Sequence, residues 1–147
     1  MLFDIVIPMK SHRDIYNFLN SYGLAVLSTI NTEGLPHAAI VGFGQTQNLE
    51  ILFGTDNTSR KYRNLKANPH IAFAIGGNTP ETVQYEGIAR ELSESELRLV
   101  RDNYWKKNPH AEEHSRSEAE RYFIVTPTWI RYTDLRIHPW DISEIDL

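Results

Sequence analysis

The chain has 147 residues, of which 41% are hydrophobic and 23% are charged, and its formal net charge is −4. This length favours a single domain over residues 1–147, and the acidic balance without a long basic run argues against general affinity for nucleic acid. The absence of cysteine from the sequence excludes disulfides, thiolate metal sites, iron–sulfur clusters and cysteine nucleophiles.

The first eight residues, MLFDIVIP, contain an acid within an apolar stretch and lack a basic start, so they do not resemble a signal peptide. No run in the sequence approaches the roughly 20 apolar residues that are needed to span a bilayer. We therefore expect a cytoplasmic protein.

The next part of the chain is expected to form a helix followed by a β-hairpin. Apolar residues recur at helical spacing over residues 11–22, Ser11 and Asp14 match a capping box, and Gly23 is expected to end the helix. Strands are predicted at residues 24–30, 37–43 and 49–53. The first two flank a turn that contains Gly34, which is typical of a hairpin.

The stretch TDNTSRK at residues 55–61 is the most informative motif, because it joins a predicted strand to a helix that stops at Asn68-Pro69. A helix N-terminus offers unpaired N–H groups and the positive end of the helix dipole to an anion. Hydroxyl and cationic side chains gather there: Thr55, Ser59, Arg60 and Lys61. These residues predict a phosphate site. The alternative interpretation is an ordinary N-cap with solvated basic residues.

The second half of the sequence again favours strands. They are predicted at residues 70–75, 83–91, 122–126 and 128–132, the last two separated by Pro127. Gly87 suggests a bulge or a close backbone approach, and Ser93 with Glu96 caps a further helix. Residues 106–120 are polar and are expected at the surface. Six or seven short strands, mostly joined as hairpins, indicate an antiparallel barrel with peripheral helices.

Six short motifs occur along the chain in a characteristic order: Gly34-Leu35-Pro36, Phe53-Gly54-Thr55, Ser59-Arg60-Lys61, Asn68-Pro69, Glu86-Gly87-Ile88-Ala89 and Val125-Thr126-Pro127. In this order they resemble the pyridoxamine 5′-phosphate oxidase-like, FMN-binding split-barrel family, most closely its short general-stress-protein branch. The resemblance covers residues 24–132. It implies a mainly β, six-stranded antiparallel split barrel of Greek-key type, and a homodimer with FMN bound at two sites in the subunit interface.

The resemblance also assigns roles to individual residues. Ser59, Arg60 and Lys61 would hold the FMN phosphate with help from Thr55. The backbone of one strand would run along the isoalloxazine ring, through His37, Ala38, Ala39, Ile40 and Val41. The alternative is that Ala38 and Ala39 are simply small core residues.

Two departures from the family pattern concern the cofactor. Where the full oxidase has an arginine and a lysine on that strand, this sequence has Ala39 and Gly44, so FMN is expected to bind more weakly or a different flavin to be preferred. Where the oxidase has a glutamine five residues before the strand glycine, this chain has Thr82, and Gln84 falls two places later. Either Thr82 or Gln84 is a candidate to contact the isoalloxazine ring, and Gln84 is slightly favoured.

Aromatic residues near the C-terminus are candidates to cover the flavin of a partner subunit: Trp129, Tyr132 and, less so, Trp140. Plain core or interface packing is the alternative. Arg136-Ile137-His138 is similar to an Arg-x-His pair at the oxidase's substrate site, but its spacing from Pro127 is shorter and the longer substrate-binding segment is missing. True pyridoxamine phosphate oxidase activity is therefore not expected.

Residues 110–114, HAEEH, match the H-x-x-E-H pattern of inverted zinc peptidases. A helix starting at Pro109 would place His110 and His114 on one face. Nothing else in the sequence resembles that enzyme architecture, so we interpret the match as chance and expect no metal.

Together these features predict an FMN-dependent oxidoreductase with an unknown small substrate, in which the flavin carries the redox chemistry. No side chain stands out as a catalytic acid or base. The alternatives are a non-catalytic flavin carrier or sensor, and a deazaflavin-dependent reductase of the same fold.

Overall fold

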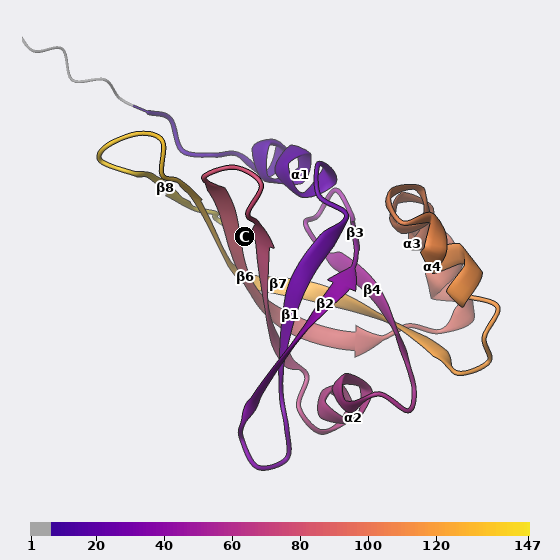
Figure 1. Ribbon diagram of the computed structural model, residues 1–147. Helices are drawn as coiled ribbons and strands as arrows, with labels where there is room; N and C mark the ends of the chain where they lie inside the picture. Colours follow the sequence, from indigo (N-terminus) through magenta and orange to yellow (C-terminus); the bar gives the residue numbers. More distant parts are fainter. Residues whose placement is uncertain (1–6) are drawn as a thin grey trace, which may run out of the picture.

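The computed structural model describes residues 7–147 (Figure 1). Most of the N-terminal stretch that we compared with a signal peptide lies outside these residues. Within the described part of the chain, no helix combines the length and the apolar character that crossing a membrane requires.

The fold is an antiparallel split barrel with helices at its periphery, as the sequence predicted (Figure 1). The strands are β1 (Leu24–Ile30), β2 (Pro36–Gly42), β3 (Gly44–Gln45), β4 (Ile51–Asp56), β5 (His70–Gly76), β6 (Glu81–Glu91), β7 (Glu120–Asp134) and β8 (Asp141–Glu144). The helices are α1 (His12–Asn20), α2 (Arg60–Ala67), α3 (Glu94–Lys107) and α4 (Pro109–His114).

All described strands belong to one sheet in the order β2-β1-β5-β6-β7-β4-β3, with β8 paired to the free side of β7. Every pairing is antiparallel. The sheet has eight strands where six were expected. Two of them, β3 and β8, have two and four residues, too short to show a period-2 pattern in the sequence.

The barrel interior is filled by aromatic and branched side chains. Phe53 stacks on Phe123 and meets Phe73 edge to face. Tyr85 is 1% exposed, and its hydroxyl donates to the carbonyls of Leu49 (2.8 Å) and Val125 (3.1 Å). This buried phenol therefore ties the turn before β4 to β7, and burial raises its pKa.

The predicted helix starts are confirmed, whereas one predicted helix end is wrong. Ser11 with Asp14 and Ser93 with Glu96 form complete capping boxes. The first helix ends at Asn20, three residues before Gly23, and Gly23 does not adopt a left-handed conformation. The backbone N–H of Ser21 reaches back to α1 carbonyls, so no glycine cap is needed.

Two predicted strand boundaries are also wrong. The strand expected at residues 49–53 begins at Ile51, because Leu49 has a φ of 62° and lies in the preceding turn. The runs expected on either side of Pro127 form the single strand β7. Pro127 faces Gly87 where the β6–β7 register shifts, and a bulge tolerates a residue without an N–H. The expectation for Gly87 is thereby confirmed.

The expectation that residues 106–120 lie at the surface is partly wrong. The Lys107 ammonium is half-buried, donating to the carbonyl of Leu19 (3.0 Å) and to Gln45 Oε1 (2.5 Å), and it lies 3.7 Å from the centre of the Phe43 ring. The end of α3 is therefore fixed to α1 and β3 through one cation.

Lys107 makes stability depend on pH in a predictable direction. Burial lowers its pKa to about 7, so the unfolded chain binds more protons than the folded chain between about pH 7 and 10. We expect the free energy of unfolding to rise with pH across this range and the rise to shrink in Lys107→Met. Urea unfolding at pH 7 and 9 checks this, with the exposed Lys106→Met as the control that keeps the rise.

Candidate functional site

The N-terminus of α2 has the geometry that the sequence predicted. Ser59 is the N-cap residue, and its Oγ accepts from the backbone N–H of Tyr62 at 3.2 Å. The hydroxyls of Thr55, at the end of β4, and Ser59 are 2.8 Å apart. The end of a strand and the start of a helix therefore place two hydroxyls beside the two consecutive cations Arg60 and Lys61.

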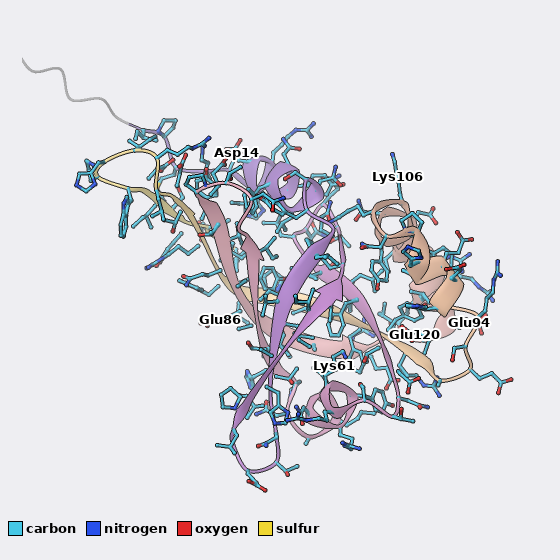
Figure 2. All side chains as sticks on the ribbon, in the orientation of Figure 1. Asp14, Lys61, Glu86, Glu94, Lys106 and Glu120 are labelled. Carbon is cyan, nitrogen blue, oxygen red and sulfur yellow. The ribbon has the colours of Figure 1, made fainter. Side chains whose placement is uncertain are left out.

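Two neighbouring cavities open at this helix start, and Lys61 lines both. Lys61 and Glu120, which lines one of them, are labelled in Figure 2. The first, about 270 Å³, lies between β1, β2 and α2, and we call it the His37 cavity. Its lining residues are Leu27, Thr29, His37, Ala38, Ala39, Arg60 and Lys61. The second, about 390 Å³, is called the Glu120 cavity. Its lining residues are Ile40, Val41, Gly54, Thr55, Asp56, Ser59, Lys61, His114, Ser117 and Glu120.

A chain of polar contacts crosses the His37 cavity from its exposed mouth to the core. The Arg60 guanidinium donates to His37 Nε2, and Asn64 Nδ2 lies 2.9 Å from His37 Nδ1. Asn64 Nδ2 is also 3.0 Å from the hydroxyl of Thr29. Asn64 and Thr29 are both buried, so the half-buried His37 is held between the interior and an exposed arginine.

The Glu120 cavity combines charges of both signs. Glu120 is half-buried, and a Cβ atom on Gly54 would lie only 2.6 Å from its Oε1, so the carboxyl group rests on that glycine. Desolvation raises the pKa of Glu120; nearby Asp56 acts in the same direction, while His114 and Lys61 oppose it. This is a carboxyl group suited to holding a proton closer to neutrality than an ordinary glutamate.

Glu120 was not among the residues that the sequence nominated, and His114 was set aside with the H-x-x-E-H match. Glu120 lies opposite Asp56 because β7 pairs with β4, a contact between segments far apart in the chain. His114 reaches the same cavity from the end of α4. The H-x-x-E-H match drew attention to His114 as a possible metal ligand, but no local pattern could indicate its neighbours in the Glu120 cavity.

The raised pKa of Glu120 predicts that its charge destabilises the fold at neutral pH. The carboxyl group of Glu120 has one pKa in the unfolded chain and a higher pKa in the folded chain. At a pH above both values, the folded chain carries a carboxylate that burial disfavours. At a pH below both values, the carboxyl group is protonated in both states. Glu120→Gln is therefore expected to unfold at a higher temperature than wild type at pH 7 and at a similar temperature near pH 4. Thermal unfolding at the two pH values measures this, with the exposed Glu118→Gln as control. A lower midpoint for Glu120→Gln at pH 7 contradicts the prediction.

The structure brings together nine of the residues that the sequence nominated, all of which line one or both cavities. These residues are His37, Ala38, Ala39, Ile40, Val41, Thr55, Ser59, Arg60 and Lys61. His37, Ala39 and Val41 pair with inward-facing residues of β1, whereas Ala38 and Ile40 point to the outer face of the sheet.

Three other nominated residues, Thr82, Gln84 and Trp129, line neither cavity and lie on β6 and β7. Two rows of paired residues cross the outer face of the sheet: Ile40–Val26–Ala74–Gln84 and Ala38–Ser28–Ala72–Glu86–Trp129. We call this surface the outer face. Gln84 and Trp129 therefore share a surface with Ala38 and Ile40. Thr82 follows the same alternation as Gln84.

The remaining C-terminal candidates have other neighbours. Tyr132 is 3% exposed, its hydroxyl donates to Glu81 Oε2 at 2.6 Å, and its ring meets Phe18 edge to face beside α1. Trp140 is exposed. The Arg136 guanidinium pairs with Asp134 (2.8 Å) and Glu81 (2.9 Å), so its charge is already neutralised within the chain.

The H-x-x-E-H motif forms α4, with His110 exposed and in contact with Glu113 (3.3 Å). Among residues 7–147, no group of three or more histidine, aspartate or glutamate side chains is arranged to hold a metal ion.

Most of the chain matches one known protein family. Residues 12–134 match the pyridoxamine 5′-phosphate oxidase family. No sequence relative was found among the curated proteins.

Solved structures of several proteins have the same fold at low sequence identity. A heme-binding protein from Mycobacterium smegmatis has a TM-score of 0.76 and 19% identity, covering 95% of this chain and 59% of its own length. General stress protein 26 from Bacillus anthracis has a TM-score of 0.68 and 21% identity, covering 82% and 92% of the two chains. The heme storage protein HutZ from Vibrio cholerae has a TM-score of 0.69 and 18% identity, covering 81% and 91%. The chain thus spans less than two thirds of the M. smegmatis protein and most of the other two.

Proposed function

The chain belongs to the pyridoxamine 5′-phosphate oxidase family, and from this membership we propose that it binds FMN across the His37 and Glu120 cavities. The observation that carries the proposal is that the two cavities share Lys61 and together contain every group that the sequence nominated for the phosphate. Two neighbouring cavities that share a lining residue can hold a ligand with one charged end and one flat, largely apolar end.

The donors at the start of α2 fit a phosphate. Arg60 is exposed and supplies a guanidinium, and Lys61 supplies a second cation between the cavities. The N–H groups of the first turn of α2 and the hydroxyls of Thr55 and Ser59 complete the donor set. Asp56 also lines the Glu120 cavity, but its carboxylate accepts from the Thr58 backbone and hydroxyl in the turn.

The neighbouring strand fits a flat ring. Ala38 and Ala39 carry small side chains next to the cavity, so a planar group can approach the backbone of β2. Glu120 and His114 line the Glu120 cavity, where they can hold or transfer a proton next to a bound ligand. When bound, a flavin would supply hydride and electron transfer, and the proposed activity is an oxidoreductase acting on an unknown small substrate.

The proposed assembly is a homodimer in which the outer face meets a second copy. Its support is the apolar side chains that the outer face exposes on β1 and β2: Val26 is 39% exposed and Ile40 70%. In such a dimer Gln84 and Trp129 would approach the partner's cavities. We expect light scattering to give the mass of a dimer, and Ile40→Asp to shift it toward the monomer. The exposed Leu99→Asp on α3 is the control that leaves the mass unchanged.

A heme is the second candidate, because two of the similar structures are a heme-binding and a heme storage protein. The residue of this chain that favours it is His114, an exposed imidazole at the edge of the Glu120 cavity. A deazaflavin and a non-catalytic flavin carrier remain the alternatives within flavin binding.

An absorbance spectrum of the protein after incubation with each cofactor and gel filtration tests the proposal. Flavin bands that co-elute with the protein after FMN addition support it. A protein that retains heme, with its intense Soret band, or a deazaflavin but not FMN refutes the FMN assignment. Oxidation of a reduced nicotinamide by the FMN-loaded protein separates an enzyme from a carrier.

A further inference from the structure

The contact between Arg60 and His37 determines which ring nitrogen of the imidazole acts as the acceptor. A guanidinium carries only N–H donors and stays charged, so His37 Nε2 must present its lone pair to Arg60. The Asn31 amide nitrogen lies 3.3 Å from the same Nε2 atom, which makes a second donor directed at that lone pair. These contacts therefore assign the ring proton of His37 to Nδ1.

The proton on Nδ1 in turn determines the orientation of Asn64. An N–H at Nδ1 needs an acceptor, and the amide terminus of Asn64 lies 2.9 Å away. The two ends of an amide are interchangeable in shape, so the hydrogen bonds decide which atom faces the ring. The oxygen must face it, and Thr29, 3.0 Å from that same amide atom, donates its hydroxyl hydrogen. Both ring nitrogens of His37, the Asn64 oxygen and the Thr29 hydroxyl are then paired, and we call the series Arg60–His37–Asn64–Thr29 the relay.

The relay ends in the core and leads outward to a charged side chain. Thr29 is 2% exposed and Asn64 is 5% exposed, so both are fixed by packing on β1 and α2. Arg60 is exposed, and without the contact to His37 its side chain would sample many rotamers. Ligand binding would then have to select one rotamer, and the lost side-chain entropy would lower the affinity. His37 accepts from one N–H group of the Arg60 guanidinium, which carries five such donors.

We propose that His37 is a positioning residue that makes this site selective for a phosphorylated ligand, by holding Arg60 in place through the relay to Asn64 and Thr29. The inference rests on the proposed function, since it concerns the phosphate end of the same ligand. It assigns a role to the His37 side chain, whereas the family resemblance implied a role only for its backbone. The ligand class it predicts is a flavin carrying a phosphate, in preference to the same ring system without one.

The test compares FMN with riboflavin, which lacks the phosphate, by fluorescence titration of the wild-type protein and variants. We expect His37→Phe to weaken FMN binding about 10-fold and riboflavin binding less than about twofold, as loss of one oriented charged hydrogen bond should. His37→Gln should retain most of the FMN affinity, because the glutamine oxygen can accept from Arg60. Thr29→Val, which removes the last donor of the relay without changing the cavity mouth, should lower FMN affinity in the same phosphate-dependent manner.

The effect must also depend on Arg60. In an Arg60→Ala background, His37→Phe should change FMN affinity less than about twofold, because the group that it positions is gone. Equal losses for FMN and riboflavin, or an undiminished loss without Arg60, would overturn the positioning role while FMN binding by the wild type upholds the proposed function. If the wild type binds neither flavin, the proposed function fails and the inference fails with it. If His37→Phe does not fold, the Gln and Val variants decide the question.

Discussion

Replacing Arg60 with alanine should weaken FMN binding about 10- to 150-fold, or about 1.5–3 kcal/mol, while riboflavin binding changes little. Arg60 lines the His37 cavity and is exposed, and it is the side chain there that offers several N–H donors in a fixed fork. Its loss removes both the forked contact and half of the side-chain positive charge next to the phosphate.

Titration of flavin fluorescence at low ionic strength measures this effect. Raising the salt concentration should reduce the difference in FMN affinity between the wild type and Arg60→Ala. Arg63→Ala is a matched control: Arg63 lies on the same helix and is exposed, but it lines neither cavity. Unchanged FMN affinity in Arg60→Ala would rule out the phosphate site described here, even if the protein retains flavin.

Introducing a side chain at Gly44 should destabilise the fold by at least about 1–3 kcal/mol. A Cβ atom there would lie 2.6 Å from both the Cα and the Cβ of Tyr104 and 2.8 Å from its backbone nitrogen, so no rotamer change can relieve the clash. α3 must shift away from β3, which also disturbs the hydrogen bond from the Gly54 N–H to the Tyr104 hydroxyl.

Urea unfolding of Gly44→Ala checks this, and Gly23→Ala is the control because its nearest neighbour would be 3.6 Å away, an ordinary contact. Equal stability of the two variants would show that α3 can move without cost. Gly44 lies on β3 and not on β2, and α3 occupies the space that a lysine side chain would need at this position.

Local chemistry made the helix starts predictable, including the one at Ser59 where the anion site is proposed. Ser11, Ser59 and Ser93 each cap a helix through contacts within three residues, so the sequence alone contains the whole interaction. The cations that follow Ser59 are likewise contiguous in the sequence. The short β-rich runs and the turns between them were enough to indicate the antiparallel barrel.

Long-range contacts made the rest unpredictable. Glu120 has an unremarkable polar neighbourhood in the sequence, and its environment arises only when β7 pairs with β4. Lys107 looked like a solvated end of a helix, but its ammonium contacts Leu19 and Gln45, 88 and 62 residues away. Pro127 was interpreted as the break between two strands. The bulge that lets β7 continue through it forms only when β6 pairs with β7, so the sequence around Pro127 does not reveal it.

Ile40 belongs to two surfaces at once, since it lies on the outer face and also lines the Glu120 cavity. A second copy seated on the outer face would cover Ile40 and with it part of the cavity mouth. Subunit association and ligand binding would then be thermodynamically linked, each strengthening the other by the same factor. Dilution should therefore release the ligand as well as the subunits, and a saturating ligand should hold the pair together at concentrations where the empty protein separates.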